Sequence, residues 1–177
     1  MVTGTGSRSK LPSGPPTRIG LISDTHGLLR EEAVRALRGS ELIIHAGDVG
    51  RADILDGLKA LAPVLAIRGN VDTQPWALAL PQTVMAGAGP VTFYVLHDLK
   101  ALNLDAAAAG IHVVVSGHSH KPGKTERAGV WYINPGSAGP RRFRLPITVA
   151  RLDLSKKPWG LEFVNLEAPS VSTWRRP

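Results

Sequence analysis

The sequence contains no cysteine, and no apolar run in it approaches the ~18 residues that a membrane-spanning helix needs. The first absence excludes disulfide bonds and zinc sites built from thiolates. The N-terminal stretch MVTGTGSRSKLPSGPPT also lacks the apolar segment of a signal peptide. The chain shows no RNA- or DNA-reading motif and no internal repeat. We therefore expect a cytoplasmic protein without a membrane anchor.

The 177 residues suffice for one domain with a hydrophobic core, because 43% of them are hydrophobic. The predicted domain covers residues 18–167. It follows a disordered arm over 1–17, rich in Gly, Pro and Ser, and precedes a loose tail over 168–177. The net charge of +7 alone favours an ordinary basic protein with solvated lysines and arginines; attraction to partners that carry phosphate is the alternative interpretation. Nucleic acid is a partner class that the charge permits and no motif supports, and a homo-oligomer is left open.

Five segments of the chain share one pattern, an apolar run followed by a turn with polar residues: 18–26, 41–48, 63–70, 91–98 and 112–120. Short runs rich in Val and Ile are typical of strands buried on both faces. Apolar residues at helical spacing lie between the first three segments, over 28–40 and 51–62. This alternation predicts a parallel α/β core. Hairpin patterns over 124–137 and 146–166 predict a second, more antiparallel sheet.

Each of the five predicted strands ends in one or two side chains that can bind a metal ion. They are Asp24, His26, Asp48, Asn70, His97, His118 and His120. Open α/β sheets bind ligands at the carboxyl ends of their strands, so we expect these side chains to meet in one crevice. Each residue alone has an ordinary explanation, such as a helix cap or a hydrogen-bonded core histidine. Seven of them in the same position relative to a strand predict a metal site.

The predicted ligands are four imidazoles, two carboxylates and one amide oxygen. This set suits Mn, Fe, Zn, Co or Ni, and it is large enough for two ions that share a carboxylate. Asp48, third in the order, is the natural bridge. Two divalent ions, two aspartates and a bridging hydroxide leave one net positive charge, which matches the single negative charge of a phosphodiester. Gly47, Gly69 and Gly117 each precede a ligand, where glycine permits a positive φ and close backbone approach.

The motifs DTH, GD, GN, a lone histidine and GHSH, in this order, resemble those of the calcineurin-like metallophosphoesterase superfamily. GNVD and YINPGSAG are similar to its small single-domain prokaryotic phosphodiesterase branch. The resemblance implies an α/β fold, a four-layer αββα sandwich of two mixed β-sheets flanked by helices. It also implies a phosphodiesterase that acts on a small phosphodiester or a nucleotide. A hydroxide bridging two divalent metals would attack the phosphorus, with Mn as the first choice and Ni, Zn, Fe or Co as alternatives.

The resemblance further implies a role for each residue of the set. Asp24, His26, His120 and Asp48 would hold one metal, and Asp48, Asn70, His97 and His118 would hold the second. Asp48, Asn70 and His26 are the predicted catalytic residues. Neighbouring side chains predicted to support ligands or to touch substrate are Asp72, Asp98, Arg141 and Arg142.

Two positions depart from the family pattern. Val71 stands where many relatives have a histidine that helps to protonate the leaving group, so we expect good leaving groups or a water as the acid. Asp98 follows His97 where many relatives have a glycine and a second histidine, which leaves the shape of this loop open. Two other functions also stay open: a non-catalytic protein-interaction scaffold, like the retromer scaffold subunit, and a nuclease or nucleotide phosphatase. The intact set of seven ligands favours the enzyme.

Overall fold

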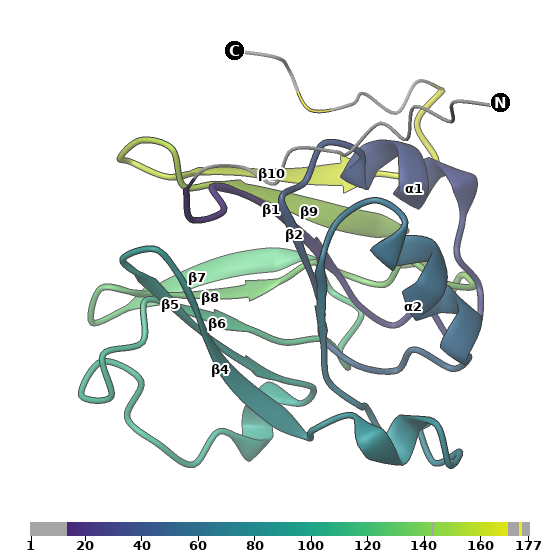
Figure 1. Ribbon diagram of the computed structural model, residues 1–177, viewed down its shortest axis with the longest axis horizontal. Coiled ribbons are helices and arrows are strands. Elements are labelled where there is room, and N and C mark those ends of the chain that lie inside the picture. The colour runs from purple at the N-terminus through teal and green to yellow at the C-terminus, as the bar shows by residue number, and fades with distance from the viewer. Residues whose placement is uncertain (1–13, 143, 170–173, 175–177) are drawn as a thin grey trace, which may run out of the picture.

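The computed structural model describes residues 14–142, 144–169 and 174. Two five-stranded mixed sheets face each other (Figure 1). The first has the order β10 (Gly160–Asn165), β9 (Thr148–Asp153), β1 (Arg18–Ile22), β2 (Leu42–His45) and β3 (Val64–Ala66). The second has the order β4 (Thr83–Ala88), β5 (Val91–Leu96), β6 (Val113–Val115), β8 (Val130–Asn134) and β7 (Gly123–Arg127).

The first sheet is built around three parallel strands, β1, β2 and β3, joined by α1 (Glu31–Leu37) and α2 (Ala52–Lys59). Both helices lie on the outer face of this sheet (Figure 1). Leu37 and Leu58 pack there against Ile22 and Ile43, and all four side chains are fully buried. Because side chains alternate along a strand, Ile19 and Leu21 of β1 face the second sheet instead.

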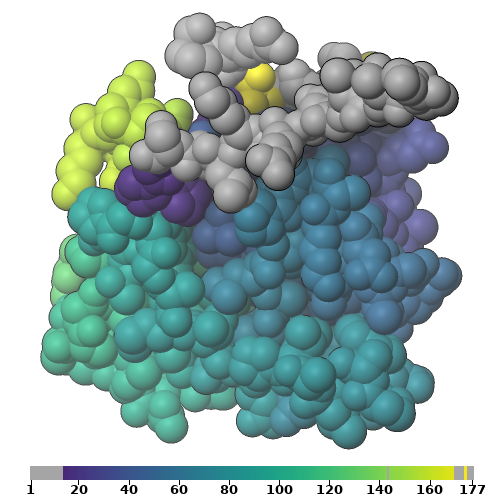
Figure 2. All heavy atoms as spheres, viewed as in Figure 1, coloured from purple at the N-terminus to yellow at the C-terminus, as the bar shows by residue number. Residues whose placement is uncertain are grey.

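The core between the two sheets is apolar and fully buried at its centre. Phe93 and Val95 of β5 and Val113 and Val115 of β6 meet the inner face of the first sheet. In the space-filling view the blue and teal segments, from α2 to the strands of the second sheet, form one continuous surface (Figure 2). The sandwich therefore holds the ends of strands from both sheets in fixed positions relative to one another.

The outer face of the second sheet is covered by the segment over 99–111, which begins with the 3₁₀ helix η2 (Leu99–Ala101). A second 3₁₀ helix, η1 (Ala77–Ala79), precedes β4. Leu99, Leu102 and Ala106 pack against Val114 of β6. The predicted class of two mixed sheets in an α/β fold is confirmed, with turns and one 3₁₀ helix as the fourth layer.

The predicted parallel core and both predicted hairpins are present, but the prediction of which sheet they join was partly wrong. The hairpin β7–β8 joins the second sheet, while β9–β10 joins the first, antiparallel to β1. Five of the six residues of β9 are buried, which suits a strand between two others rather than an edge. The parallel strands β5 and β6 also belong to the second sheet, so parallel pairs occur in both.

The described strands begin at Arg18 and end at Asn165, inside the predicted domain 18–167. Most of the predicted arm 1–17 and tail 168–177 lies outside the described residues, and the domain limits stay a prediction. No helix in the described part of the chain is long and apolar enough to cross a membrane.

Candidate metal centre

Strand ends from both sheets meet at one edge of the sandwich. Asp24 and His26 follow β1, Asp48 follows β2, His97 follows β5 and His120 follows β6. Asp24 Oδ1 lies 3.2 Å from His120 Nε2, 3.8 Å from His26 Nε2 and 3.9 Å from His97 Nε2. Asp48 Oδ2 lies 3.3 Å from His97 Nε2 and 3.9 Å from His26 Nε2. The structure thus brings together five of the seven predicted ligands.

These five side chains form two overlapping groups. Asp24, His26 and His120 make one, and Asp24, Asp48 and His97 make the other, with the ligand atoms of each group within 4.8 Å of one another. His26 Nε2 and His120 Nε2 lie only 3.4 Å apart. Imidazole nitrogens and carboxylate oxygens are ligand types that divalent transition metals prefer, and here they lie close enough to bind one ion together.

Each aspartate is held by one oxygen and presents the other to the imidazoles. Asp24 Oδ2 accepts hydrogen bonds from the Ser23 hydroxyl (2.6 Å) and the His118 backbone N–H (3.2 Å). Asp48 Oδ1 accepts one from the Val71 backbone N–H (3.0 Å). The orientation of the two inward oxygens is therefore set by the surrounding loops.

The His97 ring shows that a cation fits this site. Its Nδ1 donates to the carbonyl of Ala46 at 2.7 Å, so Nε2 is the atom that faces the carboxylates. His97 Nε2 and Asp24 Oδ1 are both buried without a hydrogen-bond partner among the described residues. Buried polar atoms are normally satisfied. A metal ion bound by both atoms would satisfy them, and the donor set suits it.

Burial and the short distances between these carboxylates and imidazoles also shift their pKa values. Burial disfavours the charged form of Asp48, but His97 and the Val71 N–H outweigh it and lower the pKa of Asp48 to about 2. Burial also opposes the charged form of His97, yet its contacts with Asp48 and Ala46 raise its pKa. Burial is the main cause that raises the pKa of Asp24 and lowers that of His26.

Five of the predicted ligands have a left-handed backbone, which residues other than glycine rarely adopt. The φ angles are +54° at Asp24, +46° at His26, +54° at Asp48, +65° at His118 and +58° at His120. Among the other described non-glycine residues only Ala128 has a positive φ. Such a conformation costs about 1–3 kcal/mol each and concentrates at functional sites. It turns the chain sharply at the sheet edge, where these five side chains lie.

The glycines before the ligands act mainly by allowing close approach. Gly47 has a φ of +91°, as predicted, whereas Gly69 and Gly117 have no left-handed φ. A Cβ at Gly69 would lie 2.2 Å from Asp48 Oδ1, and one at Gly117 would lie 2.0 Å from Ser23 Oγ. The absence of a side chain at these two positions therefore lets the loops of β3 and β6 pack against the aspartates.

Asp72 holds the loops after β2 and β3 together. Its carboxylate is buried and accepts backbone hydrogen bonds from Val49 (3.0 Å), Gly50 (2.8 Å) and Gly69 (2.8 Å). These loops carry Asp48 and Asn70. Of the two roles predicted for Asp72, support of ligands or substrate contact, the geometry favours the first.

Replacement of Asp72 by asparagine should destabilise the fold, because one oxygen becomes an N–H₂ group that faces backbone N–H donors. We expect a loss of about 2–4 kcal/mol in the free energy of unfolding, since hydrogen bonds to charged groups contribute about 1.5–3 kcal/mol each. Urea denaturation measures it. The matched control is Asp56→Asn on the exposed face of α2, which should change stability by less than about 0.5 kcal/mol. Equal stability of the two variants would contradict the structural role of Asp72.

A further support of the site comes from the end of β8 and the segment that follows it, which the sequence analysis used for the family resemblance and not as part of the site. Asn134 Nδ2 donates to the carbonyl of Gly117 at 2.7 Å. The Ser137 hydroxyl and the Gly139 backbone N–H donate to the carbonyl of Asp24 at 3.0 and 3.1 Å. The NPGS motif at residues 134–137 is the sequence feature that marks this segment, but the motif does not show which loops its residues will contact.

The remaining two predicted ligands lie at the rim. The His118 ring packs edge-on against His97, with 5.3 Å between centroids, and its Nε2 lies 3.9 Å from Asp98 Oδ2. Its side chain is 43% exposed. Asn70 is exposed and lines a hollow together with His97 and Asp98. Asp98 also accepts the Lys100 N–H, which begins η2. Metal ligation by His118 and Asn70 stays a prediction.

The two arginines predicted to touch substrate differ in their surroundings. Arg141 forms an ion pair with Glu167, which occupies its guanidinium. Arg142 is exposed, and its positive charge helps to lower the pKa of His26, for which burial is the largest cause. Of the pair, Arg142 is the one that forms no ion pair among the residues that the structure describes.

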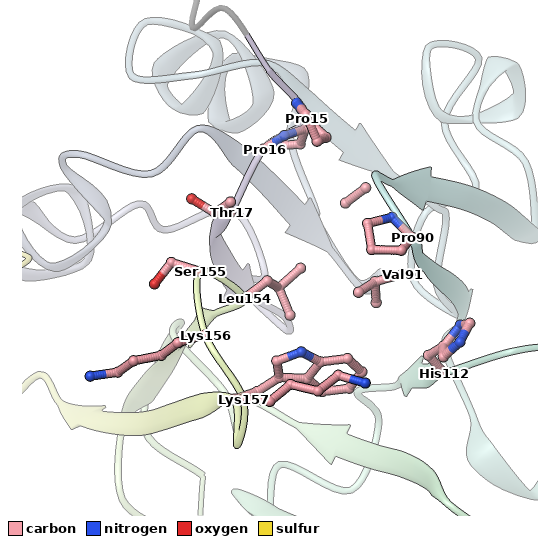
Figure 3. Close-up of a pocket in the computed structure, with 12 residues that line it drawn as sticks. Pro15, Pro16, Thr17, Pro90, Val91, His112, Leu154, Ser155, Lys156 and Lys157 are labelled. Atoms are coloured by element: carbon pink, nitrogen blue, oxygen red, sulfur yellow. The ribbon is translucent and has the colours of Figure 1, made fainter.

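The two histidines outside the set have structural contacts. His45 is fully buried, and its Nε2 lies 3.0 Å from the hydroxyl of Thr25. Burial lowers the pKa of His45 to about 4, which keeps the ring neutral. His112 Nδ1 accepts the Thr92 N–H and lines a hollow of about 350 Å³ at the amino ends of β1 and β5 (Figure 3). None of the predicted ligands lines that hollow.

The fold and the site together define a metal-binding α/β sandwich. Residues 17–157 match the calcineurin-like phosphoesterase superfamily domain. The chain is 33% identical over 164 residues to a probable metallophosphoesterase of Methanothermobacter thermautotrophicus, covering 85% of this chain and 94% of the relative. It belongs to the calcineurin-like phosphoesterase superfamily, as its motifs predicted.

Solved structures share the same fold. An archaeal phosphodiesterase superposes with a TM-score of 0.71 and 24% identity over 83% of this chain and 99% of the other. Vps29 of Entamoeba histolytica, in complex with Zn²⁺, superposes with a TM-score of 0.70 and 20% identity over 88% and 96% of the two chains. At these sequence identities the similarity establishes only the fold. The reaction has to be inferred from the residues of the site.

Proposed function

We propose that this phosphoesterase hydrolyses phosphodiesters, with two divalent metal ions at the cluster of Asp24, His26, Asp48, His97 and His120. Two overlapping ligand groups support two ions rather than one. Asp24 belongs to both groups, and Asp48 Oδ2 is also within 4 Å of imidazoles from both, so each aspartate can bridge two ions by distance. We assign the bridge to Asp48 because the family motifs imply it. Asn70 and His118, at the rim, would complete the second ion.

The observation that carries the choice of a diester is a pair of hollows at the rim of the site, both of which Asp98 lines. One, of about 700 Å³, is lined by Asn70, His97 and Asp98, and the other, of about 820 Å³, by Asp98 and His118. A phosphodiester has two ester arms, and each hollow can receive one. A phosphomonoester has a single arm and would leave one hollow without a contact.

The residues of the chain then have separate tasks. The bound ions would lower the pKa of a nucleophilic water and withdraw charge from the phosphoryl oxygens. Asp24 and Asp48, each fixed through its other oxygen, keep the ligand geometry constant during the reaction. Arg142, whose positive charge contributes to the lowered pKa of His26, would meet a phosphoryl oxygen of the substrate. Val71 is exposed and offers no proton, so the leaving group must be a good one or take its proton from water.

The experiment is hydrolysis after metal removal and reconstitution. Protein treated with a chelator and then given Mn²⁺, Ni²⁺ or Zn²⁺ should hydrolyse bis(p-nitrophenyl) phosphate with a higher kcat/KM than p-nitrophenyl phosphate, and Mn²⁺ should serve best. The metal-free protein should lose activity by at least about 10³-fold, since the ions supply several kcal/mol of charge stabilisation. Bound metal is counted by mass spectrometry.

Two results would change the proposal. Preference for the monoester would move it to a phosphatase. Full metal occupancy without turnover of either ester would favour the protein-interaction scaffold, which the fold of Vps29 also supports.

A further inference from the structure

We propose that the hollow beside His118 binds a second phosphate, carried on one ester arm of the substrate. We call it the cationic hollow and define it by His118, Lys100, Lys121, Arg127 and Tyr132, with Asp98 at its inner end. The inference rests on the proposed diesterase activity and names its substrate class: a phosphodiester with an additional anionic group on one arm.

The strand pair β7–β8 aims one set of side chains into this hollow. Arg127 pairs with Val130 and Thr125 with Tyr132, so these side chains share the outer face of the second sheet. The Arg127 guanidinium lies over the Tyr132 ring, with 5.5 Å to its centroid. Lys124 alternates to the opposite face, where its Nζ lies 3.5 Å above the Trp131 ring. Lys124 also lines the hollow, but it forms an ion pair with Glu126 at 3.5 Å, so it is not among the unpaired cations there.

The charges along the hollow are uneven. Lys100, Lys121 and Arg127 form no ion pair with any residue that the structure describes. Asp98 is the one acidic residue among the described lining, and it lies at the end next to His118. Solvated lysines on a surface are ordinary. Three unpaired cations around one hollow that His118 lines, at the rim of the candidate metal centre, instead form a local field that attracts a second anion.

The distance over which the cations are spread matches the length of an ester arm rather than the size of the reacting phosphate. Lys121 directly follows His120, at the metal centre. At one end of β8, Asn134 donates a hydrogen bond to the carbonyl of Gly117, in the loop that carries His118 and His120. At the other end of β8, four residues earlier, Val130 pairs with Arg127. At ~3.3 Å per residue this places Arg127 about 13 Å from Asn134. The cations thus extend from the reacting centre along an arm of nucleoside size.

The test compares two substrates with the same scissile bond. One is the p-nitrophenyl ester of thymidine 5′-phosphate, and the other carries an additional 3′-phosphate. We expect the 3′-phosphate to raise kcat/KM about tenfold at low ionic strength, which equals about 1.4 kcal/mol. The advantage should disappear at 1 M salt, where the screening length is about 3 Å.

Variants locate the effect. Arg127→Ala and Lys121→Ala should each bring the ratio of kcat/KM for the two substrates toward 1, and Arg127→Lys should retain part of it because the charge remains. The control is Lys59→Ala, which removes an exposed lysine from α2, on the outer face of the first sheet. It should leave the ratio unchanged. Calorimetric binding of thymidine 3′,5′-bisphosphate against thymidine 5′-phosphate provides a readout that needs no turnover and should show the same loss in Arg127→Ala.

The outcomes separate the two proposals. Hydrolysis of both substrates with a ratio near 1, or a ratio that Arg127→Ala leaves intact, overturns the second-phosphate site and leaves the diesterase standing. No hydrolysis of either substrate with metal bound, together with equal binding of the two nucleotides, overturns both. The p-nitrophenyl ester of a thymidine tetranucleotide, which keeps the same leaving group, distinguishes the source of the second phosphate: a higher kcat/KM than that of the small bisphosphate ester points to oligonucleotides, and a lower one points to a small molecule.

Discussion

The variant Asp48→Asn is expected to hydrolyse a phosphodiester with a kcat/KM at least about 10³-fold below that of the native protein, equal to about 4 kcal/mol. The asparagine can retain the acceptor for the Val71 N–H, so the loop stays in place. What is lost is the charge at Oδ2, the oxygen 3.3 Å from His97 and 3.9 Å from His26. Metal content and turnover are measured on the same sample.

The control for this variant is Asp56→Asn, which removes the same charge from an exposed position on α2. It should keep native turnover and native metal content. If Asp48→Asn kept native turnover at equal metal occupancy, the proposed bridge between two ions would be wrong.

The variant Gly117→Ala should lose both stability and metal. Its new Cβ would lie 2.0 Å from Ser23 Oγ and 2.6 Å from Asp24 Oδ2, far inside contact distance. Ser23 and Asp24 are fully buried and hydrogen-bonded to each other, so neither can move away freely. We expect a loss of about 3 kcal/mol in the free energy of unfolding, measured by urea denaturation of the metal-free protein. Metal affinity should fall about 10–100-fold, because Asp24 is displaced.

Gly123→Ala is the matched control, since no atom lies within 4 Å of a Cβ built there. Its stability should change by less than about 1 kcal/mol, through the unfolded chain alone. Native stability and metal affinity in Gly117→Ala would show that the loop of β6 adjusts, and that close packing against Asp24 is not what requires glycine.

Much of the site could be predicted from the sequence because its chemistry is local to each strand end. A buried apolar run followed by Asp24 and His26, or by His118 and His120, identifies both a strand and its potential ligands. The parallel order of β1, β2 and β3 followed from the helices between them. The family followed from the order of the motifs.

Other features of the site depend on contacts that no local pattern encodes. The three N–H groups that meet at Asp72 come from two loops, and the left-handed φ of Asp48 is a property of the folded turn. The placement of β9 in the first sheet depended on burial on both of its faces. The ion pair that occupies Arg141 depends on Glu167, 26 residues away.

By itself the sequence determined which side chains could bind metal and where on their strands they stand, because residue type and strand ends are local properties. Only the tertiary structure decided which of these side chains meet. His97 forms a hydrogen bond with the Ala46 carbonyl, 51 residues away in the sequence, and the rings of His26 and His120, 94 residues apart, lie in contact. Both contacts arise because the two sheets pack face to face with their strand ends at the same edge. The physical reason is that the inter-sheet core fixes the spacing of the two sheets, and this spacing sets the distances between ligands.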